Sequence, residues 1–580
     1  MTPLDLSELR YLLASTYLGR DTKSLARCSR VCRSWHETFN PALWRCLPIS
    51  RLLPQTKLSY KAISQNAHLI QQLHVGRMDR TDLYPMDNCR SLKTLYVEDE
   101  RVLSDWDNYL GLSSQALHVQ GNETHDSIDG KLSTEHGVVA RKDRWILLLI
   151  MLIRQNPGLR KLCLTMDRFE PTIGLWAAIS ANPRSSPTTV PNIRHLDCLF
   201  TRIPRPNVQA CLDAFTHLES LVLQHCTFDP DFPLELLDSN RRYPRLRSLT
   251  LATNTGLDLS TQIELIRLFP EVEHLVWSIM GTQHLPVSEF CILLAQDCCK
   301  ITSLVLSDRN LEASHLARIL NSIPRLTRFF LRFDTLSSMF NDPDVMQALR
   351  RHFAVLTNVE FGQVRSSIRC GTVLELLTGC PNLQVLVAYG RLDCSRQAFF
   401  RTGTVAGIST ATTGKPGSTS TSSAIMTGPD DLFNDTPWVC LGLKRLHVIM
   451  TGDPQHSVWQ NRTLQQRLFL QLGRLKDLQT LSLGHCILWM YENGFSHHGL
   501  DFTVEAGLSK LAGLEKLEQL NIEGIYQHMG EQDVNWMLEH WPKLRVVEGE
   551  LHHRKEKRER LDAMMEQKGF KVLNHSYRRK

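Results

Sequence analysis

One pattern of apolar and polar positions recurs along most of the chain. Leucine or another apolar residue occupies the first, fourth and sixth positions of a short motif, Leu-x-x-Leu-x-Leu, and mostly polar residues fill the rest. Alternation with a period of two is typical of a β-strand that buries one face. Copies begin at Leu69, Leu92, Leu159, Ile193, Leu218, Leu246, Val272, Ile301, Leu326, Leu356, Leu383, Leu443, Leu478, Leu517 and Leu544.

The segments between these strands are predicted to be helices. A proline follows three of them, and proline cannot continue a helix. The apolar run Trp145–Ile153 is nine residues long, too short to cross a bilayer, and is interpreted as a buried helix. The other predicted helices cover Ile263–Phe269, Phe290–Cys299, His315–Ile323 and Val373–Cys380.

The spacing of the motif predicts the fold class. From Leu218 to Leu383 successive copies begin 28, 26, 29, 25, 30 and 27 residues apart. This period is typical of leucine-rich repeats, in which one strand and one helix cannot bury their apolar faces alone and stack on their neighbours. We therefore predict an α/β solenoid, a horseshoe with one strand and one helix per repeat. The cysteine that closes LESLVLQHC and LQTLSLGHC resembles the cysteine-containing subtype of this repeat.

Two gaps and a charged end interrupt the pattern. Segments near 101–144 and 395–437 are predicted to be insertions, and the second contains a Ser/Thr/Gly-rich stretch. Residues 551–580 contain ten Lys/Arg and four Asp/Glu, which equals the net charge of +6 of the whole chain. We predict a solenoid over 49–550 followed by a basic tail over 551–580, helical and solvated or flexible.

The first 48 residues show a different, helical pattern. Asp21 can cap a helix that ends at Cys28, and Val31, Cys32 and Trp35 are predicted to form one apolar stripe on a third helix that Pro41 stops. So short a unit cannot bury much apolar area by itself. The pattern therefore predicts a module, 1–48, that packs against something else.

These residues resemble an F-box. The resemblance covers Leu6 to Leu18, the helix from Asp21 to Cys28, Val-Cys-Arg-x-Trp at 31–35 and Pro-x-Leu-Trp at 41–44, although Ser7 stands where the family usually has proline. It implies an all-helical module that binds the Skp-type adaptor of a cullin-RING (SCF) ubiquitin ligase. The implied adaptor-binding residues are Leu6, Leu9, Val31, Cys32, Trp35, Leu43 and Trp44.

The resemblance implies a non-catalytic substrate-recognition subunit, with the repeats binding a target protein of unknown identity. Aromatic, Arg and other polar side chains on the outward face of the strands are the expected contacts. The candidates are Phe330, Arg332, Glu360, Tyr389, His447 and Glu523. The alternative is a scaffold or inhibitor solenoid with no ligase link, in which the helices only cap the array.

No motif indicates catalysis. The segment GKPGSTS at 414–420 departs from a phosphate-binding loop because Pro416 follows Lys415. We expect no enzyme activity, no cofactor and no metal, and as partners neither nucleic acid nor membrane. The sixteen cysteines are scattered, without zinc-finger spacing or a leader sequence before them, which favours a reducing compartment, cytoplasmic and/or nuclear.

Overall fold

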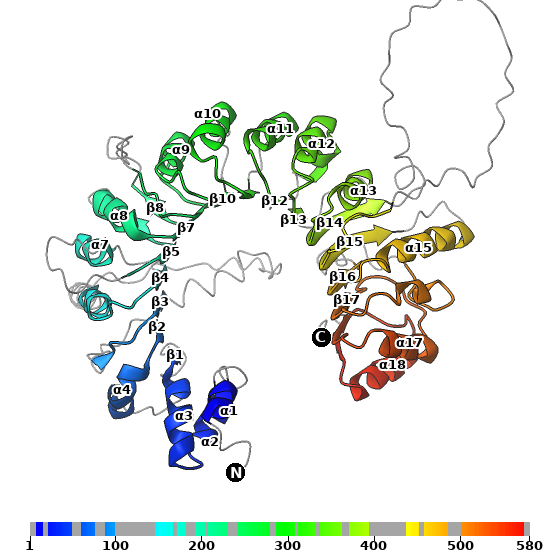
Figure 1. Ribbon diagram of the computed structural model, residues 1–580, viewed down its shortest axis with the longest axis horizontal. Helices are drawn as coiled ribbons and strands as arrows, with labels where there is room; N and C mark the ends of the chain where they lie inside the picture. The colour runs from blue at the N-terminus through cyan, green and yellow to red at the C-terminus, as the bar shows by residue number, and fades with distance from the viewer. Residues whose placement is uncertain are drawn as a thin grey trace, which may run out of the picture. The chain divides into compact units, whose positions relative to one another are not determined.

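The computed structural model describes residues 7–14, 21–48, 60–75, 88–98, 146–165, 171–180, 192–204, 207–229, 242–278, 286–307, 311–331, 337–361, 370–393, 437–451, 458–484 and 500–573. The chain divides into two compact units, Met1–Met280 and Gly281–Lys580. In Figure 1 the helices of the repeats lie along one side of the strands in each unit.

Unit 1 begins with a small helical module and continues as a parallel sheet. The module consists of α1 (Ser7–Leu12), α2 (Thr22–Cys28) and α3 (Arg33–Trp44). Each strand of the sheet pairs in parallel with the next: β1 (Cys46–Pro48), β2 (Gln72–Val75), β3 (Thr94–Glu98), β4 (Lys161–Thr165), β5 (His195–Leu199), β7 (Ser220–Gln224), β9 (Ser248–Ala252) and β10 (His274–Ser278).

Helical segments connect the strands of unit 1. They are α4 (Tyr60–Asn66), η3 (Ala67–Leu69), residues 146–155, α7 (Ile173–Ser180), α8 (Val208–Ala214), η6 (Phe215–His217) and α9 (Leu259–Arg267). Two short strands, β6 (Arg202–Ile203) and β8 (Thr227–Phe228), form a separate parallel pair.

Unit 2 repeats the same plan. Its strands, each parallel to the next, are β11 (Ser303–Ser307), β12 (Arg328–Leu331), β13 (Asn358–Phe361), β14 (Val385–Asp393), β15 (Arg445–Thr451), β16 (Thr480–Ser482), β17 (Gln519–Asn521), β18 (Val546–Glu548) and β19 (Lys571–Leu573). Its helices are α10 (Val287–Ile292), the π-helical η8 (Leu293–Asp297), α11 (Ala313–Ser322), η9 (Ser337–Asn341), α12 (Pro343–Arg350), α13 (Cys370–Gly379), α15 (Val458–Leu472), η10 (Leu508–Leu511), α17 (Glu531–His540) and α18 (Lys555–Gln567).

The motif leucines stack between the strands and the helices. Leu221, Leu249 and Leu275 occupy the same register position on β7, β9 and β10, and each is fully buried. The residues between them, such as Val222 on β7, are only partly buried because alternate strand residues face opposite sides. The predicted α/β leucine-rich-repeat fold with a helical module at its start is confirmed.

Two local predictions were wrong. Helix α3 continues through Pro41 to Trp44 because the buried Phe39 and Trp44 on either side hold the segment in its packed position. Val31 and Cys32 do not share a helical stripe with Trp35, since Cys32 is the N-cap of α3 and both residues are exposed.

The first repeat also begins one residue later than predicted. Ile70, not Leu69, is the fully buried first apolar residue, and it precedes the buried Leu73 and Val75 of β2. Leu69 ends the short helix η3 and is only partly buried.

The sequence pattern missed the first and last strands. Strand β1 lies at the end of the helical module, and β19 pairs with β18 inside the segment predicted as a basic tail. Helix α18 in that segment buries Leu561 and Met565, and Arg558 pairs with Glu550 at 2.7 Å. Residues 551–573 therefore contain the predicted helix, but with β19 they form a further repeat rather than a tail.

Of the two predicted insertions, residues 101–144 and 395–436 lie outside the described residues. Within the described ranges, no helix has the length and apolar character needed to span a membrane.

Candidate functional site

The helical module of unit 1 has a small apolar core. Ala14, Leu25 and Phe39 are buried at its centre. The indole of Trp35 stacks on the Phe39 ring, with centroids 5.2 Å apart. Partly buried Leu13, Cys28, Ala42 and Leu43 complete the packing. Because this core takes one side of each helix, the other sides stay free to face solvent or a partner.

Hydrogen bonds orient the helices of the module. Asp21 caps α2 as predicted, since its carboxylate accepts from the backbone N–H groups of Lys23 and Ser24 at 3.1 Å each. The Ser24 hydroxyl also donates to it, and these bonds lower the pKa of the Asp21 carboxyl. Arg10 on α1 donates to the Ser34 hydroxyl on α3, which holds α1 beside the start of α3.

Large apolar side chains are exposed on this module. Leu9 and Leu12 are 41% and 49% exposed and, three residues apart, share one side of α1. Tyr11 is 67% exposed, and Val31, just before α3, is 62% exposed. Exposed apolar side chains mark a docking site when they form a contiguous patch, whereas single ones are common on soluble proteins. We name Leu9, Tyr11, Leu12 and Val31 the apolar module surface.

The structure separates the predicted adaptor-binding residues into two groups. Leu9, Val31 and Cys32 are exposed, whereas Trp35 and Leu43 are partly buried in the packing of the module. Trp44 is only 9% exposed, so we leave it out of the apolar module surface. Leu6 lies outside the described residues. Tyr11 was not among the predicted residues, although its place between Leu9 and Leu12 on an exposed helix could have indicated it.

Three predicted target-binding residues share one row of the sheet in unit 2. Phe330 on β12 and Glu360 on β13 are direct register partners, and Val387 on β14 separates Glu360 from His447 on β15. Burial raises the pKa of the Glu360 carboxyl, against the attraction of Arg445. Burial also lowers the pKa of His447 to about 4, and the neighbouring Arg445 adds to the effect.

The same row continues through Ser482 on β16 to Asn521 on β17, and Glu523 lies two residues after Asn521. Its side chain is almost fully buried, and its Oε1 atom has no hydrogen-bond partner among the residues that the structure describes. Burial raises the pKa of its carboxyl to about 7, and the nearby Glu548 carboxylate adds to the shift. Asn521 lies between the two, because its amide donates to Glu548 at 2.6 Å and its oxygen accepts from the Glu523 N–H at 3.0 Å. The side chains of Arg332 and Tyr389 lie outside the described residues.

The cysteine that closes the repeat after β7 is a core residue, as predicted. Cys226 is fully buried, and its thiol donates to the Cys198 carbonyl at 3.3 Å. Burial raises the pKa of the Cys226 thiol to about 12. His225 beside it stacks on Phe200, with centroids 4.7 Å apart. Among the described residues, no group of three or more His, Cys, Asp or Glu side chains could hold a metal ion.

The comparison with protein families decides what the helical module is. Residues 15–50 match the family model described as F-box-like. The module is F-box-like. This match confirms the resemblance seen in the sequence, and it places the F-box-like module at the start of unit 1, where β1 joins it to the leucine-rich repeats.

Several solved structures resemble most of the chain at low identity. The structure of a TLR13–ssRNA13 complex has a TM-score of 0.40 and 11% identity, over 84% of this chain and 57% of that one. A leucine-rich-repeat protein of Leptospira interrogans has a TM-score of 0.36 and 12% identity, over 89% and 98%. The yeast Rad7 and Elc1 complex has a TM-score of 0.39 and 11% identity, over 78% and 100%.

The chain thus spans only 57% of the length of the TLR13 chain. The search of curated proteins found no match to this sequence.

Proposed function

We propose that the chain is a substrate-recognition subunit of an SCF-type ubiquitin ligase. The F-box-like module binds a Skp-type adaptor, and the leucine-rich repeats bind a target protein. The observation that carries the proposal is the apolar module surface, on a module that the family match places among F-box-like segments.

In this role the chain performs no chemical step. It raises the effective concentration of target lysines near a conjugating enzyme that the adaptor and cullin hold. The row of Phe330, Glu360 and His447 in unit 2 belongs to the surface proposed for the target.

Adaptor binding is tested by co-purification with the Skp-type adaptor. We expect wild type to retain the adaptor in stoichiometric amount, and Leu9→Asp/Val31→Asp to lose it, because two carboxylates would be buried in an apolar interface. The matched control is Leu470→Asp/Val439→Asp, which makes the same exchanges at side chains 51% and 38% exposed in unit 2.

Circular dichroism must show that all variants are folded. If folded wild type retains no adaptor, or if both double variants lose it equally, the receptor role is wrong. A scaffold or inhibitor role, with the module as a cap on the repeats, would then replace it.

A further inference from the structure

A column of cations runs across the first strands of unit 1, at the position just before each strand. The backbone carbonyl of each column residue accepts from the residue that begins the next strand: Arg45 from Gln72 at 2.8 Å, Lys93 from Lys161 at 3.1 Å, and Arg160 from His195 at 3.0 Å. Arg194 continues the column, and Gln71 lies between Arg45 and Lys93. We name Arg45, Lys93, Arg160 and Arg194 the basic column.

The geometry of the column follows from the parallel sheet. Neighbouring strands lie about 4.8 Å apart, so the four steps from Arg45 to Arg194 span roughly 19 Å. Arg45, Lys93 and Arg160 are exposed. Like charges at this spacing repel one another, so the column raises the free energy of the free protein unless an anion lies beside it.

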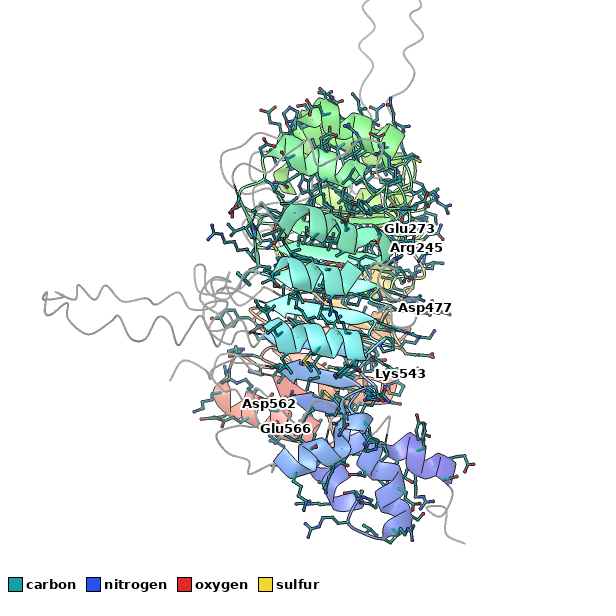
Figure 2. The ribbon with its side chains drawn as sticks, turned by 90° about the vertical axis from the view of Figure 1, so that its left-hand side faces the viewer. Arg245, Glu273, Asp477, Lys543, Asp562 and Glu566 are labelled. Atoms are coloured by element: carbon teal, nitrogen blue, oxygen red, sulfur yellow. The ribbon has the colours of Figure 1, made fainter. Side chains whose placement is uncertain are left out.

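Farther along unit 1, acidic residues at the equivalent positions neutralise the arginines. Arg194 pairs with Glu219 at 3.0 Å, and Arg247 pairs with Glu273 at 2.8 Å, each across one strand step. Figure 2 labels Glu273 and Arg245, which lies two residues before Arg247, on the same side of the unit. By contrast, no ion pair joins Arg45, Lys93 or Arg160 to any residue within the described ranges.

In the described part of the chain, the segments around the basic column are also mostly basic. Among the described residues between 45 and 204, two are acidic and nine are basic. One acid, Asp197, already pairs with Lys161 at 2.8 Å. The acids are Glu98 and Asp197, and the basic residues are Arg45, Lys61, Arg90, Lys93, Arg154, Arg160, Lys161, Arg194 and Arg202.

The fold does not require cations at this position. In unit 2 the equivalent residues include Thr302, Thr327 and Thr357. The hydroxyl of each of the last two donates to the carbonyl of the preceding one at 3.0 Å. Lys444 and Arg545 are also found at this position in unit 2, so the position accepts both kinds of residue and the run of cations in unit 1 is not a requirement of the fold.

We propose that the basic column binds an acidic peptide segment of a partner protein, about six or seven residues in extended form. Such a segment spans the same 19 Å at about 3.3 Å per residue, and its carboxylates or phosphates take the place of the missing Glu partners. A protein segment fits better than nucleic acid because the column holds only four cations, of which Arg194 already pairs with Glu219, and no aromatic side chain in it can stack on a base.

The proposed partner of the repeats is therefore a protein with an acidic segment. Calling that partner a ligase target rests on the proposed function, but the binding itself does not. Adaptor co-purification on the same variants separates the two, because Lys93 and Arg160 lie outside the F-box-like match at 15–50.

The test measures fluorescence anisotropy of a labelled (Ser-Glu)6 peptide with the full chain at low salt. We expect saturable binding that weakens as salt rises, and roughly tenfold weaker binding by Lys93→Gln/Arg160→Gln. The matched control, Lys61→Gln/Arg245→Gln, makes the same exchanges at exposed residues outside the column and should change binding less than about twofold. A (Ser-Gln)6 peptide should not bind.

Four outcomes would overturn the proposal. They are no binding of (Ser-Glu)6 by wild type, equal binding of (Ser-Gln)6, equal weakening in both double variants, or tighter binding of a dT12 oligonucleotide than of the peptide. Thermal melting checks that the variants fold, and a folded column variant with wild-type affinity would also refute it.

Discussion

The side-chain oxygen of Asn156 accepts a hydrogen bond from the backbone N–H of Leu92 over 2.8 Å, across 64 positions of sequence. The amide of Asn156 also donates to the carbonyls of Cys89 at 2.8 Å and Leu152 at 2.7 Å. Asn156 is fully buried. One side chain thus joins the segment before β3 to the helix at 146–155.

Replacing this side chain should destabilise unit 1. Asn156→Leu leaves a buried N–H and two carbonyls without this partner, and we expect the free energy of unfolding to fall by about 2 to 3 kcal/mol in urea titrations. Asn192→Leu, at an exposed position, is the control and should change it by less than about 0.5 kcal/mol. Equal effects of the two would show that Asn156 does not hold the repeats together.

In the F-box-like module the buried Trp44 is expected to contribute to stability, and the exposed Val31 to adaptor binding. We expect Trp44→Ala to lower the free energy of unfolding by about 3 kcal/mol, because the indole is buried and would leave a cavity. Val31→Asp, at a side chain 62% exposed, should leave it nearly unchanged while abolishing adaptor binding. Chemical denaturation of both variants measures the difference. If Val31→Asp unfolds the module, its loss of adaptor would say nothing about docking.

The raised pKa of Glu523 makes the stability of unit 2 depend on pH. The folded state binds this proton more tightly than the unfolded state, with a pKa of about 7 against an ordinary value of 4.5. The stabilisation is therefore complete below about pH 4.5 and is lost as the pH rises through about 7. Glu523→Gln keeps the neutral form at every pH.

We expect Glu523→Gln to gain stability relative to wild type, on the order of 2 kcal/mol, between pH 5 and pH 8. Thermal melting over that range measures the gain. Glu515→Gln, at an exposed position, should follow the wild-type profile. Parallel profiles for Glu523→Gln and wild type would mean that the Glu523 carboxyl is not perturbed by its burial.

Exposed cysteine thiols should react faster with alkylating reagents than buried ones. Cys32 and Cys299 are exposed, whereas burial holds the pKa of the Cys226 thiol at about 12 and that of Cys198 well above its usual value. Because the thiolate is the reactive form, we expect a short iodoacetamide pulse at pH 8 to label Cys32 and Cys299 before Cys198 and Cys226. Peptide mass spectrometry reports each site, and labelling of Cys226 in folded protein would contradict its place in the core.

Much of the repeat fold could be predicted from the sequence because its rules are local. A strand that buries one face repeats its apolar residues every second position, so the register of β7, β9 and β10 was readable from Leu218 onward. The first repeat was misplaced by one residue because Leu69 and Ile70 are both apolar, and only the packing of Ile70 distinguishes them. The sequence pattern did not indicate β19 because the charged side chains of the preceding helix α18 made the whole segment look like a solvated tail.

The candidate sites depended more on the tertiary structure. Phe330, Glu360 and His447 were placed on one surface by strand alternation alone, and the sheet put them in one row. The burial of Glu523 could not be predicted from its neighbours in sequence.

The sequence by itself determined the repeat period, the Asp21 cap and the F-box-like pattern, because each depends on residues within a few turns of one another. Only the tertiary structure decided that α3 continues through Pro41, that Val31 is exposed and Trp44 buried, and that Arg247 meets Glu273 while Lys93 and Arg160 meet no acid within the described ranges. The physical reason is register: which side chains face each other is set by how strands 22 or more residues apart align, and no local pattern encodes that alignment.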